Sequence, residues 1–353
     1  MKKQLLATVL TLCLIVGLLP TAVLAAGSPG ASADNPLEVP AEAFAFNNGT
    51  IGSDTSVGGI RTEWLNTQKE NLGLTSDDTS IWLEIVIPAE IDGINVTKIN
   101  RRAFEGKRPY QIASIDFSSA TNLKQIGDQA FYLRSEMSGS LDLSKTTNLR
   151  IDGPYAFSGT GITELILPSS LSSVGDSAFS SNRSLSSVVI PEGITTLGKS
   201  MFLGCTSLKS VTLPNSLQTL GEQVFQSSGL TSIVLPDGIT VIPKAAFRFC
   251  SSLERITFSD NVTVIWNAAF ENCTSLSVFK PKTDSGNSPV VLPSKLEKLG
   301  RQTFSGAFAE DMRIVVPKTV TFMGTEVMQS AHITQVVINY DTAPAEEMFL
   351  TET

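Results

Sequence analysis

Apolar residues recur along most of the chain in a pattern that repeats about every 23 residues. Three stretches share a leucine, an alternating apolar pair and a closing proline: "LSSVVIP" (Leu185 to Pro191), "LKSVTLP" (Leu208 to Pro214) and "LTSIVLP" (Leu230 to Pro236). Alternation is typical of a half-buried strand, and proline removes a backbone donor that a longer strand would need. Each unit therefore predicts one short strand that ends near its proline.

Phenylalanine marks the same place in successive units, at spacings of 27, 26, 22, 23, 23, 22, 23 and 34 residues. This phenylalanine column consists of Phe104, Phe131, Phe157, Phe179, Phe202, Phe225, Phe247, Phe270 and Phe304, and Met328 continues it. Four residues earlier lies a column in which glycine predominates, and we expect a turn with positive φ there. Its members are Asn100, Gly127, Gly153, Gly175, Gly198, Gly221, Pro243, Trp266, Gly300 and Gly324. Proline and tryptophan do not suit such a turn, so those two units are expected to turn differently.

One unit cannot bury its own apolar side chains, whereas stacked units can bury them against each other. The sequence therefore predicts a repeat solenoid of about ten repeats over residues 83–340, closed by a last strand at "ITQVVI". At about 4.8 Å per strand, the stack should be roughly 50 Å long. The 34-residue step contains an insertion near Lys280 to Pro289, which is polar and rich in turn formers and predicts a surface loop.

The flanking segments predict the remaining organisation. Residues 1–26 have two lysines, a 15-residue apolar run and a small-residue cleavage site, the pattern of a secretory signal peptide. A retained membrane anchor is the alternative, but a spanning helix needs about 20 apolar residues. Residues 27–40 are expected to be a linker and 41–82 an N-terminal cap, with a hairpin turn at Asn48-Gly49 and a short helix carrying Trp64 and Leu65. Residues 341–353 form a polar C-terminal tail.

Charge limits the class of partner. The full chain has a net charge of −8, and removal of the signal peptide with its two lysines leaves 24 Lys and Arg against 34 Asp and Glu. An acidic chain argues against a nucleic-acid partner. One local basic cluster contains Arg101, Arg102, Lys107 and Arg108. A solvated turn is the simpler interpretation of this basic cluster, and a polyanion site is the alternative.

Catalytic and metal chemistry have little support in the sequence. The chain has one histidine, His332, and any Ser-His-acid or Cys-His arrangement would have to use it. No closely spaced Cys and His set predicts a zinc site, and no glycine-rich phosphate motif occurs. We therefore expect no cofactor, no metal and no enzyme, although two carboxylates acting on a glycan could come from any pair of units.

Three cysteines share one position of the repeat. Cys205, Cys250 and Cys273 each follow the column phenylalanine by three residues, a place that Thr160, Asn182, Ser228 and Ala307 fill in other units. Small or hydrogen-bonding residues there indicate an inward turn, so the thiols are expected to be buried. Cys250 and Cys273 lie in adjacent units, near enough for a disulfide in a secreted protein, and this alternative stays open.

The strands also predict an exposed face. Their outward positions carry small, polar and β-branched side chains: Glu164, Ile166, Ser187, Val189, Ser210, Thr212, Ser232, Val234, Arg255 and Thr257. A solvated sheet surface is one interpretation. The other is a candidate interaction face for a macromolecule, because solenoids present extended surfaces of this kind.

The units resemble the BspA-like leucine-rich repeats, whose pattern runs A-F-x-x-C-x-x-L-x-x-I-x-[IL]-P-x-x-[IV]-x-x-I-G. "MFLGCTSLKSVTLPNSLQTLG" and "AFENCTSLSVF" match it closely, and "LEIVIPAEIDGINVTKINRRAF" is similar to an opening unit. The resemblance implies a right-handed stack of parallel β-strands with a turn-rich convex side and little helix. It also implies a secreted bacterial surface protein that binds protein or glycan macromolecules on host or microbial surfaces in adhesion. A structural envelope spacer without a ligand is the alternative, and a glycan-active enzyme is a third.

Overall fold

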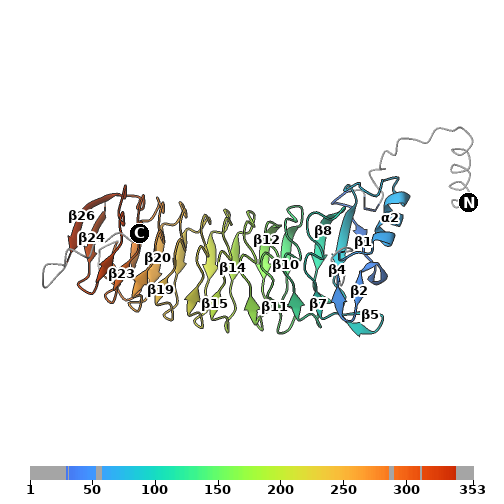
Figure 1. The fold of residues 1–353 in the computed structure, drawn as a ribbon, viewed down its shortest axis with the longest axis horizontal. Helices are drawn as coiled ribbons and strands as arrows, with labels where there is room; N and C mark the ends of the chain where they lie inside the picture. The colour runs from blue at the N-terminus through green and yellow to red at the C-terminus, as the bar shows by residue number, and fades with distance from the viewer. Residues whose placement is uncertain (1–28, 31, 53–57, 286–289, 311, 339–353) are drawn as a thin grey trace, which may run out of the picture.

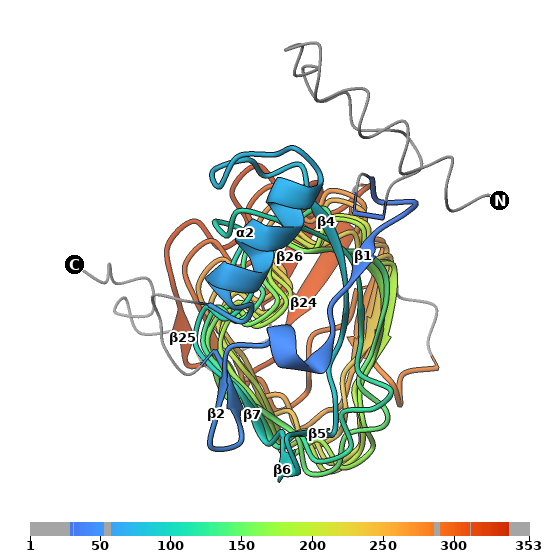
Figure 2. The ribbon, with the colours of Figure 1, turned by 90° about the vertical axis from the view of Figure 1, so that its right-hand side faces the viewer.

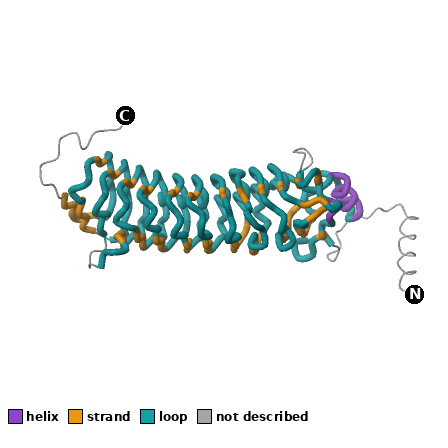
Figure 3. Tube along the Cα trace, turned by 90° about the horizontal axis from the view of Figure 1, so that it is seen from below, coloured by secondary structure: helices purple, strands orange, loops and turns teal. Residues whose placement is uncertain are grey.

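The protein is an elongated stack of parallel strands, described by a computed structural model over residues 29–338 except 31, 53–57, 286–289 and 311. The predicted signal peptide and C-terminal tail therefore lie outside the described residues. The stack makes about ten turns, each called a rung below, and the chain climbs one rung per repeat (Figure 1). Helix is confined to the N-terminal end of the described chain (Figure 3). The predicted solenoid of parallel strands is confirmed.

The main sheet contains the strands that the alternating stretches predict. It is interrupted into ladders with the orders β1-β4-β8, β10-β12-β14-β16, β18-β20-β22 and β24-β26, all parallel. The strands are β1 (Leu37–Glu38), β4 (Trp82–Val86), β8 (Gln111–Asp116), β10 (Ser138–Asp142), β12 (Gly161–Ile166), β14 (Ser187–Val189), β16 (Ser210–Thr212), β18 (Ser232–Val234), β20 (Arg255–Phe258), β22 (Val278–Pro281), β24 (Met312–Val316) and β26 (Ile333–Ile338).

A second sheet of two-residue strands lies across the core from the main sheet (Figure 2). Its ladders follow the orders β13-β11-β9-β7-β3-β2, β15-β17 and β19-β21-β23-β25. The strands are β2 (Phe46–Asn47), β3 (Thr50–Ile51), β7 (Lys98–Ile99), β9 (Gln125–Ile126), β11 (Arg150–Ile151), β13 (Ser173–Val174), β15 (Thr196–Leu197), β17 (Thr219–Leu220), β19 (Val241–Ile242), β21 (Val264–Ile265), β23 (Lys298–Leu299) and β25 (Phe322–Met323). A separate hairpin joins β5 (Glu90–Ile91) and β6 (Ile94–Asn95).

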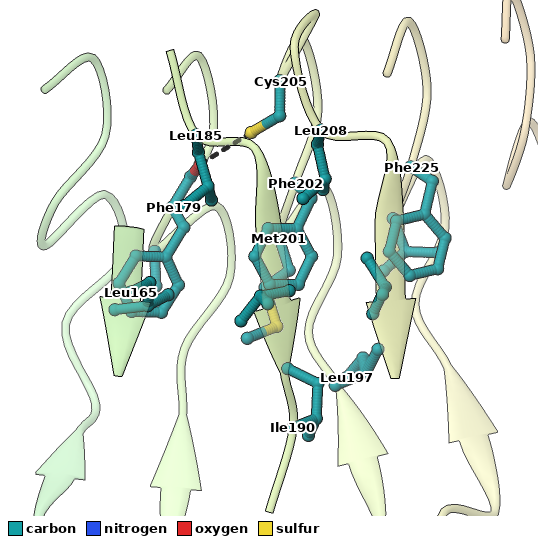
Figure 4. Close-up of a cluster of buried hydrophobic side chains, with 14 of the residues drawn as sticks. Leu165, Phe179, Leu185, Ile190, Leu197, Met201, Phe202, Cys205, Leu208 and Phe225 are labelled. Carbon is teal, nitrogen blue, oxygen red and sulfur yellow. Dashed lines mark hydrogen bonds between the residues drawn. The ribbon is translucent and has the colours of Figure 1, made fainter. Parts of the chain in front are cut away.

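The phenylalanine column forms the spine of the core. All nine rings are fully buried, and neighbouring rings stack at centroid distances of 4.9–6.0 Å. Figure 4 shows Phe179, Phe202 and Phe225 in successive rungs, with the strand leucines around them. The backbone N–H of Phe202 donates to the carbonyl of Val224 in the next rung, directly before Phe225, so the backbone hydrogen bonds align the same residues whose rings stack. This arrangement confirms that stacking buries what one unit cannot.

The glycine column has a different cause from the one predicted. Its glycines do not adopt positive φ; instead, the residue two places later does, as at Gln223 with φ of 58°. Glycine is needed because the rungs approach closely: a Cβ on Gly221 would lie 2.5 Å from the carbonyl carbon of Gly198. The expectation of a positive-φ turn in this column is therefore wrong, and in the rungs that carry glycine the close approach leaves no room for a side chain. The expectation that the units of Pro243 and Trp266 turn differently is also wrong, because Ala245 and Ala268, two places later, have φ values of 54° and 56° like their equivalents.

The N-terminal cap covers the first rung. The β2–β3 hairpin turns at Asn48 and Gly49, whose φ values are 43° and 80°, as the Asn-Gly pair predicts. After the 3₁₀ turn η1 (Ala41–Ala43), helix α2 (Thr62–Asn71) lies across the end of the stack (Figure 2) and buries Leu65. Strand β1 pairs with β4 within the segment expected to be a linker, so the sheet begins at Leu37.

The insertion begins later than its composition predicts. Lys280 and Pro281 belong to β22 and pair with Thr257 and Phe258 of β20. The chain leaves the sheet only after Pro281, because the strand of the preceding rung offers a partner up to that point. Lys282 then reaches back over the sheet, where its Nζ lies 2.8 Å from Asp237 Oδ1.

Candidate binding face

The ten predicted face residues lie together on the outer surface of the main sheet. Nine are exposed and Thr257 is half-buried, whereas the strand residues between them, such as Val188 and Ile233, are buried. The register aligns them in rows, with Ser187 beside Ser210 and Val234 beside Thr257. The alternation predicted from the sequence therefore separates a buried side from an exposed side. We call the exposed side the outward face.

Three aliphatic side chains of the outward face are open to solvent. Val189 is 63% exposed, Val234 57% and Ile166 37%. Ile166 and Val189 are cross-strand neighbours, so their exposed side chains form one small apolar patch, and Val234 lies on the far side of β16. Serine and threonine hydroxyls surround them and offer hydrogen bonds without long, flexible side chains.

A shallow groove crosses the outward face between β16 and β18. These strands are neighbours but share no hydrogen-bonded ladder, and the unit that contains β18 has one residue fewer in the preceding turn. The groove has a volume of about 260 Å³. Thr212, Val234 and Pro236 contribute to its walls, and Lys282 of the insertion lines it as well. The break in the sheet is not visible in the strand pattern of the sequence.

The three cysteines are buried, free thiols inside the turn column. The Sγ–H of Cys250 donates to the carbonyl of Phe225 at 2.9 Å, and that of Cys273 donates to the carbonyl of Phe247 at 3.1 Å. Burial raises the pKa of Cys205 to about 12 and that of Cys250 to about 11. A thiol with such a pKa stays protonated near neutrality and is unreactive. The chemistry of this column is therefore hydrogen bonding between rungs, and the Cys250–Cys273 disulfide stays a prediction.

The same column holds a charged residue that the sequence reasoning did not single out. Arg134 follows Phe131 by three residues and is only 1% exposed. Its Nε donates to the carbonyl of Phe104 and its Nη1 to the carbonyl of Tyr110, while Glu136 supplies a salt bridge at 3.1 Å. A buried guanidinium is stable only with such partners. Its position three residues after the column phenylalanine was the signal that could have identified it.

The basic cluster lies at the turn of the first rung and lines a pocket of about 360 Å³ together with Glu105. Two of its arginines link neighbouring rungs: Arg101 Nε lies 3.0 Å from Asp128 Oδ2, and Arg102 Nε donates to Gln129 Oε1 at 2.6 Å. Arg108 donates to the carbonyl of Arg102. These contacts favour a structural role for this turn.

Catalytic and metal chemistry gain no support from the geometry. His332 is exposed at the turn before β26, and its carbonyl accepts a hydrogen bond from Met312. Across the part of the chain that the structure describes, no three His, Cys, Asp or Glu side chains gather where they could hold a metal ion. Among the described helices, none has both the length and the apolar character needed to cross a membrane.

The fold and its repeating unit define a class, the parallel β-solenoid built from leucine-rich repeats. The pattern of the family described as BspA type leucine rich repeat region matches in six copies, over residues 84–186 and 172–285. The chain belongs to this family. Membership indicates a binding or scaffold role and an extracellular or surface location, and proteins of this class are generally not enzymes. No curated protein matches the chain.

Three solved structures illustrate the similarity. A leucine rich cell surface protein from Faecalibacterium prausnitzii A2-165 is 21% identical with a TM-score of 0.44, and the match covers 72% of this chain and 87% of that chain. The T. pallidum leucine rich repeat protein is 24% identical with a TM-score of 0.38, covering 55% and 77%. The pneumococcal vaccine antigen PcpA is 21% identical with a TM-score of 0.40, covering 75% and 80%.

Proposed function

We propose that the protein is secreted and acts as an adhesion scaffold, with the outward face binding a protein or glycan macromolecule on a host or microbial surface. One observation carries this proposal: exposed Ile166, Val189 and Val234 all lie on the outward face, on the two sides of the groove between β16 and β18, with hydroxyl groups around them. No aromatic or arginine-rich centre dominates the face, so affinity is expected to come from many small contacts. Stacked repeats provide the extended surface that many small contacts need.

The test is binding of the protein to a panel of immobilised matrix proteins and glycans, measured by surface plasmon resonance. The double variant Val189→Lys/Val234→Lys introduces two charges on the outward face and should weaken binding at least about tenfold. The matched control is Val241→Lys, because Val241 is 37% exposed but lies on the second sheet. Equal binding by the intact protein, the double variant and the Val241→Lys control would show that the outward face is not the binding surface. A panel without any binding at micromolar concentration would favour a structural spacer.

A further inference from the structure

Charge is distributed along the outward face with opposite signs at its two ends. Two rows of outward side chains run along it: in each strand, one row takes the residue before the buried central residue and the other takes the residue after it. The first row reads Glu164, Ser187, Ser210, Ser232 and Arg255, and the second reads Asp142, Ile166, Val189, Thr212, Val234, Thr257 and Lys280. Acidic residues thus lie toward the N-terminal rungs and basic residues toward the C-terminal rungs.

The centre of this distribution is β16, and the two halves are complementary about it. One rung to either side, Val189 corresponds to Val234 and serine corresponds to serine. Two rungs to either side, Glu164 corresponds to Arg255, and neither has an ion-pair partner among the described residues. Three rungs away, Asp142 corresponds to Lys280. Two of the equidistant pairs therefore carry opposite charges and one carries like apolar groups, whereas Ile166 corresponds to Thr257 and Ser140 corresponds to Val278.

Such a pattern matches the requirement of an isologous contact, in which a surface meets itself across a two-fold axis. A two-fold axis lying along β16, in the plane of the contact, reverses the order of the rungs and keeps each row opposite the same row. Glu164 of one copy then faces Arg255 of the other, and the reverse pair forms symmetrically. Val189, the most exposed aliphatic side chain of the face, meets the Val234 rung and the groove beside it.

We propose that the partner of the outward face is the outward face of a second copy of this chain. This inference rests on the proposed function, because it names the microbial surface macromolecule as the protein itself. The nearly straight stack in Figures 1 and 3 lets several rungs meet at once. Homophilic contact between copies on two surfaces would then join those surfaces.

The area of the contact sets its expected strength. The rungs from Asp142 to Lys280 span six steps of about 4.8 Å, and the strands contribute a width of about 15 Å. The contact therefore covers about 450 Å² per copy, roughly half of the 800 Å² typical of a stable interface. A single pair of copies should associate weakly, and many copies on two surfaces would act together. Opposite charges at the two ends would fix the register rather than supply most of the affinity.

The experiment is sedimentation equilibrium of the protein over a range extending to high micromolar concentration, at low and at high salt. The intact protein is expected to form a weak dimer that salt weakens further. Glu164→Arg and Arg255→Glu each place like charges opposite one another twice in the dimer, so each should weaken association at least about tenfold. An equimolar mixture of the two variants restores both opposite-charge pairs and should recover the dimer. The pair Asp142–Lys280 is less suitable, because Lys280 also lies 3.9 Å from Asp284.

The controls make the same charge changes at exposed positions away from the outward face. Glu90→Arg lies in the β5–β6 hairpin and Lys244→Glu lies just after β19, so both should dimerise like the intact protein. A monomer at every concentration, or a mixture that does not recover the dimer, would overturn the inference. If the intact protein stays monomeric but panel binding is lost in Val189→Lys/Val234→Lys, only the second-copy inference fails and the proposed function stands.

Discussion

Replacement of Phe202 by alanine tests whether the stacked phenylalanines hold neighbouring rungs together. Phe202 is fully buried, and its ring lies 6.0 Å from that of Phe179 and 5.9 Å from that of Phe225, nearly parallel to both. Both neighbours would lose a ring contact, and the cavity would lie inside the stack, where backbone hydrogen bonds to the adjacent rungs limit collapse. The variant therefore removes packing from three rungs at once.

The expected cost follows from this geometry. Truncation of a buried phenylalanine typically costs about 3–5 kcal/mol, and each stacked ring pair contributes about 0.5–1.5 kcal/mol beyond its burial. With two ring pairs lost, Phe202→Ala should lie near the upper end, at about 4–5 kcal/mol. The matched control is Phe249→Ala, because Phe249 is 42% exposed and the guanidinium carbon of Arg248 lies over its ring, 4.6 Å from the ring centroid. Its loss should cost no more than about 1 kcal/mol.

Urea unfolding followed by circular dichroism measures both variants against the intact protein. Because a repeat array is stabilised by contacts between neighbours, Phe202→Ala should also separate the transition into two steps, one for each side of the weakened rung. Tryptophan fluorescence reports on both sides, since Trp64 lies in the cap and Trp266 lies beyond the substituted rung. If Phe202→Ala and Phe249→Ala differed by less than about 1 kcal/mol, the column would not be the main link between rungs.

Three further predictions concern the glycine and cysteine columns. Gly221→Ala should lower the free energy of unfolding, measured in urea, by at least about 2 kcal/mol, because the added Cβ would meet backbone atoms of the neighbouring rung. The control Gly204→Asn should be nearly neutral, because Asn272 adopts the same positive φ at the equivalent position of its own rung. Equal costs for the two variants would contradict the idea that close approach of the rungs excludes a side chain at Gly221. A thiol titration of unreduced, denatured protein cleaved after Ala26 should count three thiols, and a count of one would show the Cys250–Cys273 disulfide. The raised thiol pKa values also predict that the stability contributed by the buried thiols is complete below pH about 9 and declines as pH rises toward 11–12. The reactivity of the thiols should rise over the same pH range, because the thiolate is the reactive form.

The stacking columns could be predicted from the sequence because one rung determines the next. A residue such as Phe202 packs on its own equivalents 23 residues away, so the period alone indicates which side chains are buried together. The position of the glycine column was equally clear, but its cause was not. Whether a missing side chain serves a positive φ or a close approach depends on the distance between rungs, which no single unit contains.

The break in the sheet between β16 and β18 could not be predicted for a related reason. The shorter unit was visible as a spacing of 22 residues, yet the unit that ends at Phe179 has the same spacing and its strand β12 still pairs with the preceding strand β10. A one-residue deletion can be absorbed in the turn or can shift the strand away from its neighbour. The choice depends on contacts such as that of Gly229, whose absent Cβ would lie 2.2 Å from the carbonyl oxygen of Thr206.

The outward face differs from the columns in what its sequence has to satisfy. Glutamate, serine and arginine occupy the same row at Glu164, Ser187 and Arg255, and all three are exposed, so stacking does not select among them. Inward positions hold leucine, isoleucine or valine in nearly every rung, because each must pack on its equivalents. A regular order on the unconstrained side, with acidic residues at one end and basic residues at the other, is therefore not required by folding. The charge reversals at Glu164 and Arg255 are therefore expected to change association between copies with little change in the free energy of unfolding.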